Sequence, residues 1–326
     1  MKNYTYDAEK LKDWIKKDGI KKFAVQVPAG LMHHAKAIRE EFSSFGDCYI
    51  YAEPSFGACD FPQKQQIQYV DGVVNLGHAR IPNITSERVL FLELYADISP
   101  DTLSFECSPE VLGKHTALFT TVQYLPLLPS IKEKLKDAGI NAHIGRPGKR
   151  TMYEGQVLGC DVSSPCALAG YVDSYLFVGD GDFHPHGVCM QTSKPVFRYR
   201  INERKIERVQ FDRERFLKKR YGIAYTIQKV TDVGVVVCVK PGQLRMHTAT
   251  ALCDTLRQHG KKAQIIYANN ISPAILDYSG FDLIVSTACP RIALEDYINY
   301  KLPMLTPQEA LLGLGEKKEY EIDQIL

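Results

Sequence analysis

Short apolar runs alternate along the whole chain with segments that carry apolar residues at helical spacing. The first run, residues 22–27, precedes such a segment, and residues 48–52 then form a second apolar run. This order predicts a strand, a helix and a strand. Because the same order recurs at residues 116–144 and 233–267, the chain is expected to contain one structural unit three times.

Each copy of the unit has a third apolar run that begins at an aspartate, namely Asp71, Asp173 and Asp282. These runs are rich in Val, Leu and Ile, which is typical of parallel strands that are buried on both faces. A glycine follows each predicted helix, where a positive φ is favourable, at Gly46, Gly139 and Gly260. We therefore expect an α/β protein made of βαβαβ-type units with parallel sheets.

The positions of these units predict three similar domains arranged pseudo-threefold around a central site. The first covers residues 1–104, the second residues 105–205, and the third residues 206–326, with a basic linker helix at its start. One large doubly wound sheet is the alternative. Near the C-terminus, Thr306-Pro-Gln-Glu309 has the residues of a capping box, so a short helix is expected to begin there.

Composition is that of an ordinary globular protein. The 326 residues are 45% hydrophobic and 24% charged, and no apolar run approaches the ~18 residues of a membrane span. The N-terminal residues have no secretory signal pattern, so we expect a cytoplasmic protein without a membrane partner. The formal net charge of +2 predicts no direct contact with nucleic acid.

Positive charge is concentrated in one basic stretch, residues 198–220, which holds ten Lys or Arg and four acidic residues. Its net charge of +6 can steer an acidic protein partner. The alternative is a solvated helix whose faces carry charges of both signs.

The nine cysteines fall into three groups. Three lie in predicted strands or on the apolar face of a predicted helix and are expected to be buried: Cys48, Cys238 and Cys253. Three have loop or boundary positions that the sequence does not resolve: Cys107, Cys166 and Cys189. The last three, one in each unit, follow a strand within a segment of turn-forming residues: Cys59, Cys160 and Cys289.

Open parallel sheets bind ligands outside the carboxyl ends of their strands. Three similar units around an axis would therefore bring Cys59, Cys160 and Cys289 to one centre. Thiolates select zinc, copper(I) or iron–sulfur clusters, and a cluster held by three cysteines keeps one iron open for substrate. The long spacing matches no short metal motif, so the residues alone leave the metal undetermined.

Five segments carry recognisable motifs. They are the glycine-rich turn before Cys59, Gly155-Gln-Val-Leu-Gly-Cys160, Phe177-Val-Gly-Asp-Gly-Asp-Phe-His-Pro-His-Gly187, Lys240-Pro-Gly-Gln243 and Asp282-Leu-Ile-Val-Ser-Thr-Ala-Cys-Pro-Arg291. Together they resemble the 2-(3-amino-3-carboxypropyl)histidine synthases of diphthamide biosynthesis, from Val25 to Pro307. Asp180 and Asp182 depart from the family pattern, in a loop where less charge is expected.

The resemblance implies a homodimer of three-domain chains in which Cys59, Cys160 and Cys289 hold a 4Fe-4S cluster. It implies reductive cleavage of the Cγ–S bond of S-adenosylmethionine, with an electron from an external donor and release of methylthioadenosine. The 3-amino-3-carboxypropyl group is then added to C2 of a histidine in translation elongation factor 2. The CxxxCxxC loop of the usual radical S-adenosylmethionine enzymes does not occur in this chain.

Five further residues are candidates for the same site. His184 could order S-adenosylmethionine or take the imidazole proton, and His78 ends a strand at the expected centre. Gly242 and Gln243 lie at a strand-to-helix turn that attracts a carboxylate, and the fork of Arg291 suits a carboxylate. Each also has a structural explanation, as a histidine bonded to backbone, a turn residue, or an arginine paired with a nearby aspartate.

Two other functions stay open on the sequence. A quinolinate synthase-like enzyme would also use three domains and a three-cysteine cluster, but it condenses small metabolites and needs no S-adenosylmethionine. The other is a non-catalytic electron-transfer or scaffold subunit of a hetero-complex. The presence of all three candidate ligands in one chain argues against that subunit.

Overall fold

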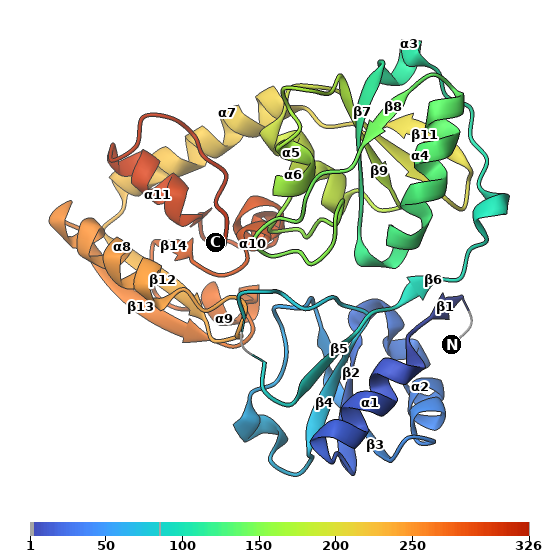
Figure 1. The fold of residues 1–326 in the computed structure, drawn as a ribbon. Coiled ribbons are helices and arrows are strands. Elements are labelled where there is room, and N and C mark those ends of the chain that lie inside the picture. The colour runs from blue at the N-terminus through green and yellow to red at the C-terminus, as the bar shows by residue number, and fades with distance from the viewer. Residues whose placement is uncertain (1–2, 85, 326) are drawn as a thin grey trace. The chain divides into compact units, whose positions relative to one another are not determined.

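The structure is a computed structural model that describes residues 3–84 and 86–325. The chain divides into two compact units, Met1–Gln210 and Phe211–Leu326. Among the described residues, unit 1 contains two main sheets and unit 2 contains one, each accompanied by helices (Figure 1). The strands of all three sheets are mostly parallel, as expected for the α/β class.

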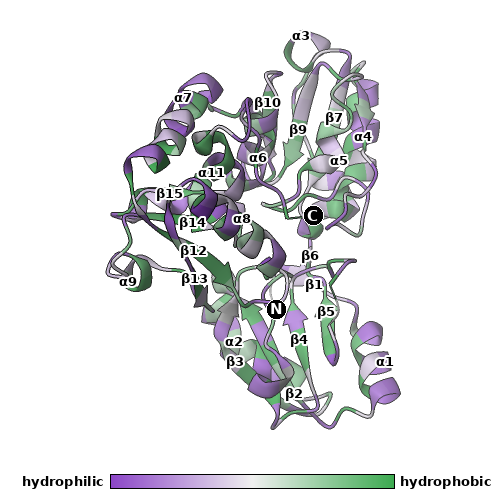
Figure 2. Cartoon of the chain, turned by 90° about the vertical axis from the view of Figure 1, so that its left-hand side faces the viewer, coloured by the Kyte–Doolittle hydropathy of each residue, from purple (hydrophilic) through white to green (hydrophobic). Residues whose placement is uncertain are grey.

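The first sheet of unit 1 has four parallel strands in the order β3 (Asp47–Ser55), β2 (Lys22–Pro28), β4 (Gly72–Leu76) and β5 (Val89–Leu92). Two α-helices accompany it, α1 (Ala8–Asp18) and α2 (Ala35–Phe42). Leu11 of α1 and Ile38 of α2 belong to the apolar cluster of this sheet. The remainder of α1 is largely hydrophilic (Figure 2), so the helix contributes one apolar edge to the core.

The second sheet of unit 1 runs in the order β8 (Asn141–His143), β7 (His115–Thr120), β9 (Ser174–Val178), β10 (Val196–Arg200) and β11 (Lys205–Arg208). Only β11 is antiparallel to its neighbour. The helices are α3 (Pro109–Leu112), α4 (Leu128–Asp137), α5 (Ser163–Cys166) and α6 (Phe183–Gln191). A short antiparallel pair, β1 (Tyr4–Thr5) with β6 (Tyr95–Ala96), precedes this sheet.

Unit 2 begins with α7 (Arg213–Ala224) and has one parallel sheet in the order β13 (Lys262–Ala268), β12 (Asp232–Cys238), β14 (Leu283–Ser286) and β15 (Met304–Leu305). Its other α-helices are α8 (Met246–Gln258), α9 (Pro273–Leu276), α10 (Pro290–Leu294) and α11 (Pro307–Leu314). The expected capping box is confirmed, because Thr306 and Glu309 exchange side-chain and backbone hydrogen bonds at the start of α11.

Short 3₁₀-helices connect several of these elements. They are η1 (Ala29–His34), η2 (Lys64–Ile67), η3 (Pro100–Thr102), η4 (Val122–Leu127), η5 (Tyr225–Lys229) and η6 (Asp296–Asn299). Three of them, η1, η4 and η5, directly precede or follow an α-helix, where the tighter turn is common.

The structural repeat is confirmed in the sheets. In each one, the second strand of the repeat lies at an edge, followed by the first, third and fourth strands. The three expected aspartates also have one role, because each accepts hydrogen bonds from backbone amides at the start of the first strand. The Oδ2 atom of Asp71 is 2.8 Å from Lys22 N, that of Asp173 is 2.9 Å from His115 N, and that of Asp282 is 3.0 Å from Asp232 N. These bonds lower the pKa of each aspartate.

Some predictions about the repeat are not confirmed by the structure. The prediction that the first helix ends at Gly46 is wrong, because α2 already ends at Phe42. Gly139 and Gly260 have the expected positive φ, of 79° and 75°. The domain boundaries after residues 104 and 205, and the pseudo-threefold arrangement, stay predictions. The contacts within the chain group the first two sheets into unit 1.

The predicted third unit has a helix near its start, α7 (Arg213–Ala224), which holds only the second part of the basic stretch. Arg198 and Arg200 of the same stretch lie on β10. Arg220 is buried in unit 2, where it forms an ion pair with Glu309 of α11. The charge pattern along the sequence does not reveal that Arg220 pairs with a residue 89 positions away. In the sequence analysis this buried arginine is therefore counted among the solvent-exposed charges.

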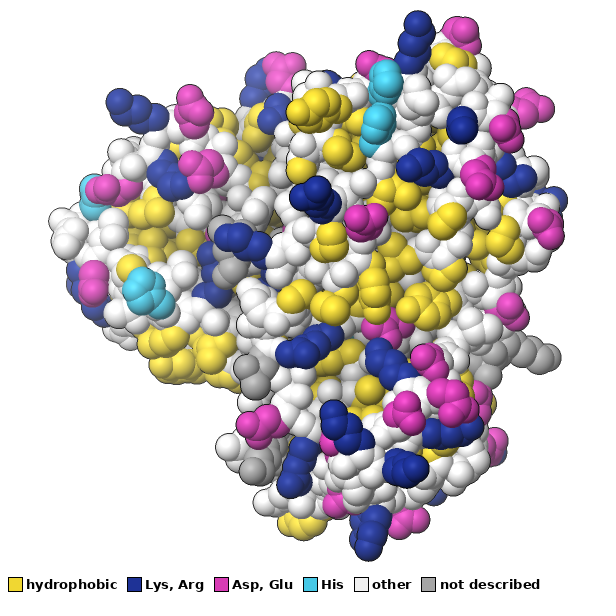
Figure 3. Space-filling model, viewed as in Figure 1, with side chains coloured by type: hydrophobic (Ala, Val, Ile, Leu, Met, Phe, Trp, Pro, Cys, Tyr) yellow, Lys and Arg dark blue, Asp and Glu magenta, His cyan; other side chains and the backbone are white. Residues whose placement is uncertain are grey.

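Charges of both signs are interspersed over the part of unit 1 that contains the first sheet (Figure 3). Ion pairs on this surface include Lys12 with Glu9 at 2.6 Å. No helix within residues 3–84 and 86–325 is long and apolar enough to cross a membrane.

Candidate functional site

Cys59 lies in the turn after β3, at the carboxyl edge of the first sheet. The carbonyl of Gly57 accepts hydrogen bonds from Ser55 Oγ and Asp60 N, both at 3.0 Å. Asn75 on β4 is fully buried and donates from Nδ2 to Ser55 Oγ and to Asp60 O, both at 3.3 Å. A core asparagine therefore holds the turn that presents the Cys59 thiol.

His78 belongs to the same hydrogen-bond network. Its Nδ1 atom is 2.9 Å from Oδ1 of Asn75. Burial lowers the pKa of His78 to about 4, so the imidazole is neutral at neutral pH. The preceding residue, Gly77, accepts a hydrogen bond at 2.8 Å from Gln123, which lies beside the second sheet. The network therefore extends from the Cys59 turn to the second half of unit 1.

Cys160 lies at the tip of a two-residue turn beyond the carboxyl end of β7. The turn is closed by two backbone hydrogen bonds between Leu158 and Asp161, of 2.9 and 3.1 Å. The Asp161 carboxylate accepts hydrogen bonds from Arg150 N and Ser163 N, both at 3.0 Å. Both ends of the turn are therefore held in place, and the thiol is presented between them.

The turns of Cys59 and Cys160 come together in unit 1. Cys59 and Leu158 both pack against an apolar cluster that contains Phe91, and a negative charge on Cys59 would raise the pKa of Cys160. Burial raises the pKa of Cys160 to about 11, although the nearby guanidinium of Arg150 lowers it. In the absence of metal the thiol is therefore protonated at neutral pH, and a bound metal would release the proton.

Arg150 is a site residue that the sequence analysis missed. It is buried, with 3% of its surface exposed, and its guanidinium forms a side-chain hydrogen bond with Cys160. The one available signal was its place ten residues before a candidate ligand. An isolated arginine at that spacing is ordinary, so only the folded chain identifies it.

In unit 2 the third candidate cysteine, Cys289, also lies beyond the carboxyl end of a strand. Cys289 follows β14, and Gly242 and Gln243 follow the neighbouring strand β12. The carboxyl ends of the two strands are joined because Thr287 N donates to Val236 O at 2.9 Å. Candidates from two of the motifs therefore lie at one edge of the third sheet.

Arg291 lies on α10, two residues after Cys289. It is buried, and its guanidinium forms an ion pair with Glu295 one turn further along the helix. The structure thus contains the structural pairing that the sequence left open, with a glutamate in place of an aspartate. Whether the arginine also binds a carboxylate ligand stays a prediction.

His184 lies on α6, beyond the carboxyl end of β9. Its ring stacks on Phe177, with 6.0 Å between the ring centroids and 20° between the planes, and Phe183 contacts it edge-on at 5.1 Å. Two aromatic rings therefore fix the orientation of the imidazole. Its catalytic role stays a prediction.

Neither unit holds a complete metal site in its described part, since no group of three or more His, Cys, Asp or Glu side chains there could hold a metal ion. Cys59 and Cys160 belong to unit 1 and Cys289 to unit 2, so the predicted ligand set draws on both. The expected burial of the first group of cysteines is confirmed for Cys48, Cys238 and Cys253. Of the unresolved group, Cys189 is buried, while Cys107 and Cys166 are half-buried.

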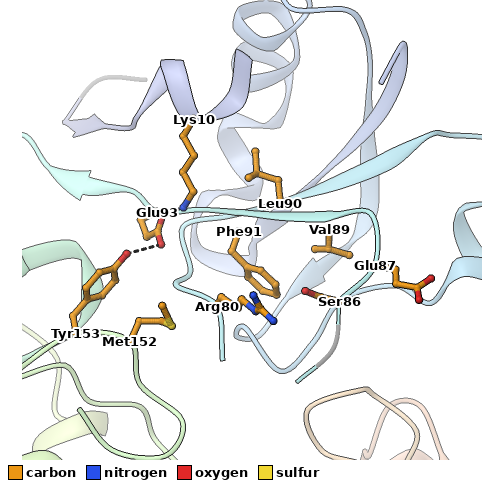
Figure 4. A pocket seen from close by; sticks show the side chains of 10 residues that line it. All are labelled: Lys10, Arg80, Ser86, Glu87, Val89, Leu90, Phe91, Glu93, Met152 and Tyr153. Atoms are coloured by element: carbon orange, nitrogen blue, oxygen red, sulfur yellow. Dashed lines mark hydrogen bonds and ion pairs between the residues drawn. The ribbon is translucent and has the colours of Figure 1, made fainter. Parts of the chain in front are cut away.

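A cavity of about 400 Å³ lies beside the segment that leads to the Cys160 turn (Figure 4). One wall carries Glu93, whose carboxylate receives Lys10 Nζ at 2.5 Å and the Tyr153 hydroxyl at 3.0 Å. Phe91, another lining residue, also packs in the cluster that contains Cys59. The cavity is therefore lined by residues from both parts of unit 1, the part that contains the first sheet and the part that contains the second sheet.

Comparisons with known proteins cover nearly the whole chain. The sequence profile of the diphthamide synthesis protein family matches residues 27–325. The 2-(3-amino-3-carboxypropyl)histidine synthase of Pyrococcus horikoshii is 33% identical over 96% of this chain and 91% of its own length. Subunit 1 of the corresponding synthase from Yarrowia lipolytica is 28% identical over 97% of this chain and 73% of its own length.

The fold has a close counterpart among solved structures. A crystal structure of Dph2 from Pyrococcus horikoshii with a 4Fe-4S cluster matches with a TM-score of 0.86 and 29% sequence identity. The match covers 99% of this chain and 94% of that one. The likeness therefore extends over all three sheets and both cysteine-bearing units.

Proposed function

The chain belongs to the diphthamide synthesis protein family, and on this premise we propose that it is a 2-(3-amino-3-carboxypropyl)histidine synthase. It transfers the 3-amino-3-carboxypropyl group of S-adenosylmethionine to imidazole C2 of a histidine in translation elongation factor 2, the first step of diphthamide biosynthesis. The observation that carries the proposal is the proximity of the Cys59 turn and the Cys160 turn, which follow strands of two different sheets, in a chain that matches the Pyrococcus synthase over 96% of its length.

The proposed cofactor is a 4Fe-4S cluster held by Cys59, Cys160 and Cys289. The residues fit such a group, because the turns of Cys59 and Cys160 lie close together in unit 1 and soft sulfur ligands suit iron. The crystallised Pyrococcus protein carries a 4Fe-4S cluster. When bound, the cluster supplies the electron for reductive Cγ–S cleavage, which releases methylthioadenosine.

The amino-acid part of S-adenosylmethionine is assigned to unit 2. Gly242 and Gln243 contribute the turn between β12 and α8, where backbone amides favour a carboxylate. Arg291, held in place by Glu295, offers its guanidinium to the same carboxylate. These residues bind and orient the sulfonium, and this orientation selects which of its three S–C bonds is broken.

Two histidines complete the proposed site. His184, oriented by Phe177 and Phe183, accepts the proton that leaves imidazole C2 of the protein substrate. His78 lines the site in its neutral form, because burial holds its pKa at about 4. The enzyme works in the cytoplasm as a homodimer, with elongation factor 2 as substrate and an external electron donor.

The ligand set is tested by substitution in the full chain. Cys59→Ala, Cys160→Ala and Cys289→Ala should each lower the iron bound after anaerobic reconstitution, because each removes one thiolate. Cys107→Ala is the matched control, since Cys107 is also half-buried but packs against the core of the second sheet. Iron content equal to the control in all three variants would exclude this set. Formation of quinolinate from small metabolites, without use of S-adenosylmethionine, would support the alternative enzyme.

A further inference from the structure

We propose that Phe183 and the Arg198–Asp182 ion pair are positioning residues that hold the Cys160 turn in place. The inference rests on the proposed function only in naming Cys160 as a cluster ligand. It begins with the loop 179–182, whose acidic residues depart from the family pattern, and with the first residue of α6.

The ring of Phe183 lies directly on the backbone of Gly159, the residue before Cys160. A Cβ atom at Gly159 would be 2.3 Å from Cε1 and 2.5 Å from Cζ of this ring, far inside van der Waals contact. The φ of Gly159 is not in the left-handed region, so the backbone itself would accept a side chain. The need for glycine at this position therefore comes from the ring.

The ring covers one face of the turn, and other contacts hold the two ends of the turn. Leu158 packs in the cluster that contains Cys59, and the Asp161 carboxylate holds the other end through Ser163 N at 3.0 Å. Between these ends, Gly159 and Cys160 occupy the two central positions. Contact of the ring with Gly159 therefore limits the movement of the residue next to the thiol.

Burial alone does not hold Phe183, because 44% of its surface is exposed. The preceding residue, Asp182, forms an ion pair with Arg198, which is buried on β10. Arg198 is itself held by Glu207 at 2.6 Å. The ion pair thus anchors the start of α6 to the second sheet and orients the ring.

The same anchor explains the acidic loop. Arg198 also donates to Asp180 O at 3.4 Å, and Asn202 Nδ2 donates to Asp180 Oδ2 at 2.6 Å. The carboxylates of Asp180 and Asp182 are thus both engaged by residues that lie on or directly after β10. Their charge is used to fix the loop rather than to act on a substrate.

The test is a rescue experiment on the full chain with two readouts. One is the iron bound after reconstitution, and the other is the rate at which iodoacetamide alkylates Cys160 in the metal-free chain, located by peptide mass spectrometry. Gly159→Ala should displace the turn, lower bound iron and change the alkylation rate severalfold. The double variant Gly159→Ala/Phe183→Ala should return both quantities to the level of Phe183→Ala alone, because the clash is gone.

Gly170→Ala is the matched control, since Gly170 has open space at its Cβ position and no positive φ. Asp182→Ala should change the alkylation rate in the same direction as Phe183→Ala, because it frees the same ring. If Gly159→Ala fails to fold, recovery of folding in the double variant supports the inference.

The inference is overturned if Gly159→Ala behaves like Gly170→Ala, or if removal of the ring does not rescue it. An alkylation rate that Asp182→Ala leaves unchanged would overturn the role of the ion pair. The alkylation rate needs no cluster and no turnover, so failure of this inference is distinct from failure of the proposed function.

Discussion

Removal of the Arg220 charge should destabilise unit 2 strongly. The side chains of Arg220 and Glu309 are 1% and 0% exposed. The Nε atom of Arg220 donates to Oε1 of Glu309 at 2.6 Å, and Nη2 donates to Met304 O at 3.0 Å. The same carboxylate receives the Tyr320 hydroxyl at 2.7 Å. Arg220→Met would leave a buried carboxylate without its counter-ion.

The expected cost is about 3–5 kcal/mol, the range for breaking a buried ion pair from one side. With a urea m-value of about 2 kcal/mol/M, the unfolding midpoint of unit 2 should fall by roughly 2 M. The double variant Arg220→Met/Glu309→Leu should recover part of this loss, because no unpaired charge remains. The double variant should still be about 1–2 kcal/mol less stable than the parent protein, because it lacks the Glu309 side chain that caps α11 and accepts the Tyr320 hydrogen bond.

The assay is urea unfolding of the full chain, followed by far-ultraviolet circular dichroism and by tryptophan fluorescence. The single tryptophan, Trp14, lies on α1 in unit 1, so the fluorescence transition reports the unit that is not altered. Lys218→Met is the control on the same helix, because Lys218 is 76% exposed and pairs with exposed Glu214. Equal midpoint shifts in Arg220→Met and Lys218→Met would refute the reasoning.

Two further predictions concern His78 and the basic stretch. The folded pKa of His78, about 4, lies below its ordinary 6.5, so stability should rise with pH between these values, by up to about 3 kcal/mol. His78→Asn should flatten this rise in urea midpoints, and an unchanged slope would contradict the pKa. If the exposed basic residues steer elongation factor 2, Lys218→Glu/Lys219→Glu should slow association at low salt and not at high salt. A rate that neither the variant nor salt alters would leave these residues as a solvated helix face.

Features encoded by local pattern were predictable from the sequence. The first three strands of each unit, the Asp71, Asp173 and Asp282 positions and the Thr306 capping box all follow from residues within a few positions of one another. The fourth strands, β5, β10 and β15, were not predicted. The same holds for the cysteine turns, because turn-forming residues after an apolar run mark the carboxyl end of a strand. Local patterns therefore identified the repeat and the candidate ligands.

Features that depend on contacts between distant residues were not predictable. Arg220 pairs with a residue 89 positions away, and Phe183 on α6 covers Gly159, which lies in a separate turn. Arg150 likewise has no sequence signal that distinguishes it from a surface arginine. The contacts of such side chains form only when the chain folds, so charge counts and motif spacing do not predict their roles.

The central claim is tested most directly by the mass of the protein substrate. The chain, reduced under anaerobic conditions with S-adenosylmethionine and elongation factor 2, should add one 3-amino-3-carboxypropyl group to a single histidine. An equal amount of methylthioadenosine should form, and an elongation factor that lacks this histidine should stay unmodified. An unchanged substrate mass, or 5′-deoxyadenosine in place of methylthioadenosine, would contradict the account.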